Sequence, residues 1–179
     1  MRNIDQILED LKPHHKITSR PSWHAKWIGA AKLAALRSHD ARTKCGCVLV
    51  DPTTQIIVAE GCNGYIRGID DSILPNYEYN DDPLLSKDMI HGEINALLSA
   101  ARLGRKTDGS VAYLTGYPCS NCYQALWQAG ITHIYVPKHP QFINCLDNDT
   151  YKERMLLLNY LTKNQLQIEE VECNIVIAT

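Results

Sequence analysis

Two short motifs, "HGE" at 91–93 and "PCSNC" at 118–122, carry residue types that can build a metal site. In the second, the Cys119 and Cys122 thiols stand where a helical pattern begins, and backbone N–H groups and the helix dipole there favour thiolates. His91 opens another helical pattern and offers a third ligand. Three protein ligands leave one zinc position open for water, which separates a catalytic site from a closed structural one.

Glu93 gives such a site a proton carrier. Zinc lowers the pKa of a bound water from about 15.7 to about 7, and a carboxylate two residues from a ligand can take the proton and pass it to a substrate. The order His-x-Glu and then Pro-Cys-x-x-Cys, with a glutamate that is not a ligand, is the signature of zinc deaminases. The sequence therefore predicts a hydrolytic zinc site.

Two other interpretations of these thiols stay open. Cys-x-x-Cys also forms the redox pair of thioredoxin-like proteins, but that role would leave Glu93 unexplained. A structural zinc site would need a fourth ligand, which Cys45, Cys47 or Cys62 could supply. These three cysteines lie on apolar strand patterns, where a free cysteine commonly packs as a small hydrophobic side chain. We therefore favour the open site.

The segments around the motifs predict an α/β domain. Strand patterns lie at 45–51, 55–63, 110–116, 132–137 and 166–172, and helical patterns at 22–40, 92–104, 120–130 and 149–165. The first two strands are expected to form a hairpin, and the later alternation of strand and helix favours parallel crossovers in a layered fold. The long segment between the second strand and His91 has no periodicity, which is typical of a functional or mobile loop.

Residue types within the helical patterns predict their ends and their buried sides. The expected N-caps are Ser22 and Ser120, and the expected C-terminal stops are Gly104 and Gly130. The helical residues expected to pack in the core are Trp23, Trp27, Ile94, Leu97, Leu98 and Ala101.

Composition places the chain among ordinary globular proteins. Its 179 residues, 45% hydrophobic and 21% charged, fit one domain over 22–179 behind a polar arm over 1–21. We expect no membrane span and no secretion signal, and hence a cytoplasmic protein. Seven cysteines favour free thiols and a metal over a disulfide framework. A net charge of −2 and a single phenylalanine disfavour a nucleic-acid partner.

From about residue 23 to 171 the chain resembles the cytidine/deoxycytidylate deaminase superfamily, and most closely its deoxycytidylate (dCMP) deaminases. The resemblance rests on "RTKCGCVLVD", "EGCNGYIRGIDDSILP", "HGEINALL", "TGYPCSNC" and "QAGITHIYV". It implies a three-layer α/β/α sandwich around a mixed central sheet of about five strands. It also implies that a zinc-activated water converts dCMP to dUMP and ammonia, which supplies dUMP for thymidylate synthesis.

The resemblance also assigns residues. The implied zinc ligands are His91, Cys119 and Cys122, and Glu93 would carry the proton. Asn63 matches the position that hydrogen-bonds the deoxyribose 3′-hydroxyl, and Lys44 and Tyr135 fit positions around the 5′-phosphate. A turn asparagine, a solvated lysine and a core tyrosine are the respective alternatives.

Family members are typically homohexamers that dCTP activates, with Mg²⁺, and dTTP inhibits. The loop that would receive the effector contains Asn63, Gly64, Arg67 and Asp71, and a merely solvated loop is the alternative. Two departures from the family pattern stand out. Gly92 replaces the usual alanine of His-Ala-Glu, and the stretch before His91 lacks the His or Cys that binds a second zinc in some relatives, so we predict one zinc per chain.

Two rival functions follow from the same residues. A deaminase acting on a base in DNA, RNA or tRNA would need a basic groove lined by aromatic side chains, which the composition does not favour. A zinc-stabilised binding module would hold a closed four-ligand site and would not turn over substrate.

Overall fold

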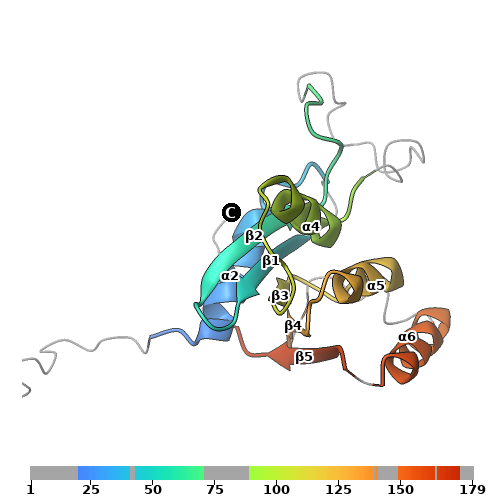
Figure 1. Ribbon diagram of the computed structural model, residues 1–179. Helices are drawn as coiled ribbons and strands as arrows, with labels where there is room; N and C mark the ends of the chain where they lie inside the picture. The colour runs from blue at the N-terminus through green and yellow to red at the C-terminus, as the bar shows by residue number, and fades with distance from the viewer. Residues whose placement is uncertain are drawn as a thin grey trace, which may run out of the picture.

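Figure 1 shows the computed structural model, which describes residues 20–40, 43–70, 89–138, 140, 149–163 and 165–173. Its elements in chain order are α2 (Trp23–Ala35), β1 (Gly46–Asp51), β2 (Ile56–Cys62), α4 (Gly92–Arg102), β3 (Val111–Leu114), α5 (Ser120–Gln128), β4 (His133–Pro137), α6 (Asp149–Leu161) and β5 (Gln167–Val171). The predicted arm over 1–21 falls outside these residues except for its last two. Across the described residues, each helix is too short or too polar to cross a membrane.

The strands form one mixed sheet in the order β2-β1-β3-β4-β5. β1 pairs antiparallel with β2, as the predicted hairpin, and antiparallel with β3. β3, β4 and β5 are parallel, because a helix connects each to the next. The five-stranded mixed sheet confirms the fold class predicted from the sequence.

Helices cover both faces of the sheet, which gives the three predicted layers (Figure 1). On one face α2 packs against β1 and β3 and buries Trp27, Ile28, Ala31, Val48, Val50 and Tyr113. On the other face α4, α5 and α6 cover a larger core that includes Leu49, Ala96, Ala112, Leu114, Leu126, Ile134 and Met155. The alternation of side chains along each strand separates the two cores.

Helix α4 buries a different face from the one that its sequence predicts. Its buried residues are Gly92, Glu93, Ala96 and Ala100, whereas Leu98, expected in the core, is 52% exposed. The cause is the close approach of β2: a Cβ on Gly61 would lie 2.4 Å from the Ala96 backbone nitrogen. Only small residues fit where a helix backbone lies directly against a strand, so Leu97 is only partly buried against the core, and Leu98 and Ala101 are exposed.

The predicted cap of α2 and the predicted glycine stops of α4 and α5 are confirmed, whereas α2 ends at Ala35 and α6 at Leu161, before the ends of their helical patterns. Ser22 caps α2, with its Oγ accepting from Ala25 N at 3.1 Å, and positive φ angles of 62° at Gly104 and 83° at Gly130 end α4 and α5. The N-cap of α5 is Cys119 rather than Ser120. Its sulfur accepts the Cys122 backbone N–H and so takes the place of the expected hydroxyl.

The two tryptophans of α2 differ in burial. Trp27 is 3% exposed and lies in the core as predicted, but Trp23 is 46% exposed, so the core prediction for Trp23 is wrong. Trp23 stacks on Trp27 with ring centroids 5.8 Å apart, and the Lys26 ammonium lies over both rings. Stacking and cation–π contact therefore replace burial for this side chain.

Candidate active site

The cysteine half of the candidate site lies where the loop after β3 enters α5, with Cys119 as the N-cap and Cys122 in the first turn of the helix. Thr115 binds this loop to the start of β1, because its N donates to Gly46 O at 3.1 Å and its Oγ1 accepts from Gly46 N at 3.0 Å. Tyr151 of α6 donates its hydroxyl to Pro118 O at 2.7 Å. These contacts fix the backbone on both sides of the turn that presents Cys119.

The histidine half lies at the start of α4, where His91 is the N-cap residue. Ile90, just before it, pairs with Gly64 in an antiparallel bridge: Gly64 N donates to Ile90 O at 3.0 Å, and Ile90 N donates to Gly64 O at 2.7 Å. The bridge connects the end of β2 to the beginning of α4. His91 therefore projects from a backbone that the sheet holds in place.

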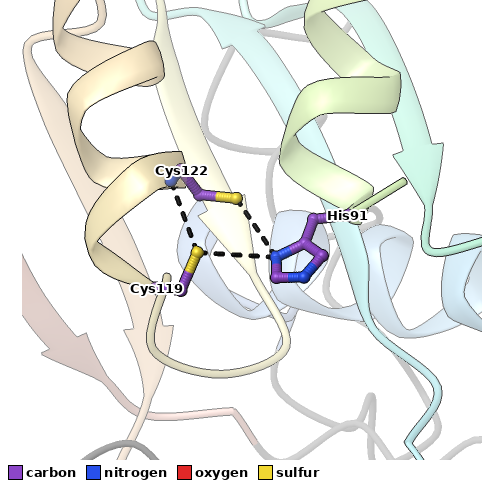
Figure 2. Close-up of side chains that lie close together, drawn as sticks. All are labelled: His91, Cys119 and Cys122. Atoms are coloured by element: carbon purple, nitrogen blue, oxygen red, sulfur yellow. Dashed lines mark hydrogen bonds between the residues drawn. The ribbon is translucent and has the colours of Figure 1, made fainter. Parts of the chain in front are cut away.

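Figure 2 shows the His91 ring facing both thiols. Its Nδ1 lies 3.5 Å from Cys119 Sγ and 3.4 Å from Cys122 Sγ. Tetrahedral zinc, with Zn–S near 2.3 Å and Zn–N near 2.0–2.1 Å, would place nitrogen and sulfur ligands about 3.6 Å apart. The spacing and the His-Cys-Cys donor set therefore fit Zn²⁺, and both halves of the predicted ligand set come together.

The ligand group has three members in the part of the chain that the structure describes, with His91 exposed, Cys119 half-buried and Cys122 buried. Among those residues, none of Cys45, Cys47 and Cys62 joins it. The closed structural site that these thiols could have completed therefore finds no support there. Exposure on the His91 side leaves the group open to solvent.

The ionisation of the three side chains suits a metal. A hydrogen bond with Cys122 is the main cause that lowers the pKa of Cys119, to about 3, and the contact with His91 adds to it. The same bond and then burial raise the pKa of the Cys122 thiol. The hydrogen bond to Cys119 raises the pKa of His91. The site thus already favours one thiolate, and metal binding would displace the remaining protons.

Glu93 lies in the first turn of α4, is 8% exposed, and does not belong to the ligand group. Burial is the main cause that raises the pKa of its carboxyl, and its own backbone N–H and the nearby His91 oppose that shift. A carboxyl with a raised pKa beside metal ligands is suited to accept and release a proton. The structure thus places Glu93 where the sequence expects a proton carrier.

Asn63 lies beside the histidine half, and its carboxamide both donates and accepts hydrogen bonds. Its Nδ2 donates to Thr43 O at 2.8 Å and to Asp40 Oδ2 at 3.4 Å. Its Oδ1 accepts from Cys45 N at 2.8 Å, and an amide oxygen can accept a second hydrogen bond. Lys44 belongs to the same segment, with Nζ donating to Ser38 O at 3.1 Å.

The remaining predicted residues are not brought to this cluster. Tyr135 packs on Tyr113 and His24, with ring centroids 4.9 and 4.6 Å apart, on the α2 face of the sheet, whereas α4 and α5 cover the other face. Arg67 is exposed beyond the Gly64 bridge. Asp71 lies outside the described residues.

Two residues that support the site were not identified from the sequence. Gly61 allows β2 to touch α4, and a glycine inside a strand pattern is a general signal of close backbone approach. Tyr151 binds the cysteine loop from 33 residues away in the chain. A tyrosine in a helical pattern carries no sequence signal for such a contact.

Comparison with known proteins adds a family and a fold. Residues 21–138 match the family described as "Cytidine and deoxycytidylate deaminase zinc-binding region". A probable deoxycytidylate deaminase of Caenorhabditis elegans is 35% identical over 115 residues, which cover 63% of this chain and 55% of that protein. The human deoxycytidylate deaminase is 30% identical over 114 residues, covering 63% and 62%. The chain thus spans less than two thirds of the length of these relatives.

Among solved structures, the dCMP deaminase of the cyanophage S-TIM5 in complex with dCMP and dUMP aligns with a TM-score of 0.60 at 22% identity. The alignment covers 86% of this chain and all of that one. At this identity the likeness establishes a shared fold, in agreement with the three layers of the sheet and helices.

Proposed function

The chain belongs to the cytidine and deoxycytidylate deaminase zinc-binding family, and on that premise we propose that it hydrolyses dCMP to dUMP and ammonia. The observation that carries the proposal is the buried Glu93 carboxyl beside three zinc ligands that leave one position open. The relatives named deoxycytidylate deaminase support the choice of substrate, as does the phage enzyme that holds dCMP and dUMP.

His91, Cys119 and Cys122 would hold one zinc per chain. When bound, zinc supplies a Lewis acid that activates water for attack on C4 of the cytosine ring. The Glu93 carboxylate would carry one proton of the attacking water to the pyrimidine ring and the other to the 4-amino group, which leaves as ammonia while the C4 oxygen becomes the carbonyl of dUMP. Burial suits Glu93 to this task, because a raised pKa makes the carboxyl hold a transferred proton more readily than an exposed glutamate would.

Asn63 and Lys44 would bind the rest of the nucleotide. The second acceptor position of Asn63 Oδ1 is suited to the 3′-hydroxyl of the deoxyribose, and its other hydrogen bonds hold the carboxamide in one orientation. Lys44, on the segment that Asn63 holds, offers a cation for the 5′-phosphate. Support for Tyr135 comes from the family resemblance alone, since its ring lies on the α2 face.

Regulation by dCTP with Mg²⁺ and by dTTP, in a homohexamer, is proposed from the family resemblance. Asn63 and Gly64 lie at the base of the loop that would receive the effector, where Gly64 pairs with Ile90. Arg67 is exposed farther along that loop. Gel filtration with and without dCTP tests this part of the proposal.

The proposed function is tested by incubating the zinc-loaded protein with dCMP, dCTP, CMP and a cytosine-containing single-stranded DNA, and following loss of cytosine absorbance. We expect turnover of dCMP above the other three. Glu93→Gln should keep the zinc and lower kcat by at least about 100-fold, the lower range for loss of a general acid–base group. Glu60→Gln on the exposed side of β2 is the matched control and should keep full activity.

Glu93→Gln should also fold well. Because the folded-state pKa of Glu93 is raised, its contribution to stability is present below the unfolded pKa and is lost as pH rises through the folded value. Because the buried charge becomes unfavourable as pH rises, the stability of the Glu93→Gln protein relative to the wild type should increase from pH 6 to pH 9. Turnover of DNA in place of dCMP, or an active Glu93→Gln protein, would refute the proposal.

A further inference from the structure

The side chain of Asn95 lies between the end of β2 and the start of α4. It stands one helical turn after His91, with its backbone N donating to His91 O at 2.9 Å. Its Nδ2 donates to Cys62 O at 2.8 Å and reaches Ile90 O at 3.5 Å. One carboxamide therefore contacts the backbone on both sides of the junction between strand and helix.

These two carbonyls immediately precede the residues that the proposed reaction needs. Cys62 is followed by Asn63, the proposed contact for the sugar hydroxyl, and Ile90 is followed by His91, a zinc ligand. The Gly64–Ile90 bridge joins the same two segments on the far side of Asn63. Asn95 thus provides a second connection between the sugar contact and the metal ligand.

Elsewhere at this junction strand and helix meet through small residues. A Cβ on Gly61 would lie 2.5 Å from Gly92 O, and one on Gly92 would lie 3.2 Å from Cys45 O. Contact between two backbones limits how closely β2 and α4 approach. It determines only weakly how far α4 is shifted along β2, because few side chains interlock. A hydrogen bond of 2.8 Å from Asn95 to Cys62 O is directional and fixes that position.

We propose that Asn95 is a positioning residue that fixes the separation of His91 and Asn63. It would thereby set where the sugar hydroxyl of a bound nucleotide lies relative to the zinc. The inference rests on the proposed function for its substrate, but its effect on the metal site is independent of turnover. Asn95 acts through the backbone of residues 62–63 and 90–91 rather than by touching substrate.

The test compares Asn95→Asp and Asn95→Ala with Thr107→Val. The aspartate keeps the shape and removes both N–H donors, and the alanine removes the group without adding charge. Thr107 is the matched control, since its Oγ1 donates to a backbone carbonyl, Ala129 O, at 2.9 Å in loops remote from the site. Urea unfolding of all three variants monitors folding.

The first readout is metal binding. Both Asn95 variants should bind Zn²⁺ about 10-fold more weakly in chelator competition, the lower range for residues that orient metal ligands. At saturating Co²⁺ their visible absorption bands should shift, because the angle at His91 changes. Thr107→Val should match the wild type in both measurements. Wild-type affinity and an unchanged Co²⁺ spectrum in both Asn95 variants would overturn the proposal.

The second readout is discrimination at the sugar. Wild-type protein should use dCMP about 10-fold better in kcat/KM than 2′,3′-dideoxycytidine monophosphate, since one hydrogen bond to the 3′-hydroxyl is lost. In Asn95→Ala that ratio should fall to about 1–2, because Asn63 is displaced. An undiminished ratio would overturn the role toward Asn63. If the wild type turns over neither nucleotide, the proposed function fails, while Zn²⁺ and Co²⁺ binding still decide the role toward His91.

Discussion

Gly61 offers the most direct perturbation of the site without touching a site residue. A Cβ at Gly61 would lie 2.4 Å from Ala96 N, 2.5 Å from Gly92 O and 2.8 Å from Asn95 C. All three are backbone atoms of α4, which cannot rotate away as a side-chain end would. Ordinary contact begins near 3.4 Å, so Gly61→Ala would require the start of α4 to recede by about 1 Å.

That displacement sets the expected size of the effect. Overpacking of this kind should lower the free energy of unfolding by about 1–3 kcal/mol. Since His91 and Glu93 move with α4, misplacement by about 1 Å should lower kcat/KM for dCMP about 100-fold. The fall in activity should persist in the fraction of protein that remains folded, which separates loss of geometry from loss of stability.

Gly92→Ala is the matched control in the same contact. Its Cβ would lie 3.2 Å from Cys45 O and 3.4 Å from Asn63 N, so a shift of about 0.2 Å suffices. Alanine also gains up to about 1 kcal/mol of helix propensity over glycine, though less in a first turn. We expect kcat/KM within about threefold of the wild type and unchanged stability.

Urea midpoints and initial rates of dCMP loss on the two variants and the wild type provide the comparison. A Gly61→Ala protein with wild-type activity would show that the distance between β2 and α4 does not determine the geometry of His91 and Glu93. A Gly92→Ala protein that loses more activity than Gly61→Ala would refute the spacing argument altogether.

Two further predictions concern tyrosines. Tyr151→Phe removes the hydrogen bond to Pro118 O. It should weaken Zn²⁺ binding about 10-fold in chelator competition, with little change in the urea midpoint. An unchanged Zn²⁺ affinity would exclude a role for Tyr151 in holding the cysteine loop. Burial raises the pKa of Tyr113, so its stabilising contribution is complete below the unfolded value of about 10 and is lost as pH rises toward the folded one. Urea midpoints at pH 8 and 10.5 should therefore fall less with pH in Tyr113→Phe than in the wild type, and an equal fall would contradict this assignment.

The ligand set could be predicted from the sequence because its chemistry is local. Cys119 and Cys122 are three residues apart at one helix start, a spacing that places both on one helix face. His91 and Glu93 both lie at the start of another helix. β1 pairs antiparallel with both β2 and β3, so these two strands run in the same direction and the helices that follow them start at the same edge of the sheet. The same locality predicted the hairpin and the glycine stops of α4 and α5.

The buried face of α4 could not be predicted in this way, because a partner far along the chain determines it. Ile94, Leu97 and Leu98 form the most apolar stripe, but Gly61 brings β2 against the backbone of α4, and the buried residues there include the small Gly92, Ala96 and Ala100. Leu97 is only partly buried and Leu98 is exposed. Glu93 is buried with them, and that burial raises its pKa. The close packing of β2 on α4 thus explains both the exposure of Leu98 and the raised pKa of Glu93.

Tertiary contacts likewise explain the other differences. Cys119 caps α5 because its sulfur is already held beside Cys122 N, which makes the Ser120 hydroxyl unnecessary. Trp23 stays exposed because Trp27 and Lys26 provide its contacts. Helical periodicity in the sequence predicts neither the contact of Cys119 with Cys122 N nor the contacts of Trp23 with Trp27 and Lys26.

The central claim is that one zinc per chain, held by His91, Cys119 and Cys122, serves a dCMP-hydrolysing site. The most direct test is a zinc titration of metal-free protein, with dUMP formation and bound zinc measured on the same samples. Activity should rise in proportion to bound zinc and level off at one equivalent per chain. Absence of dUMP at one bound zinc per chain, or equal activity without zinc, would contradict the account.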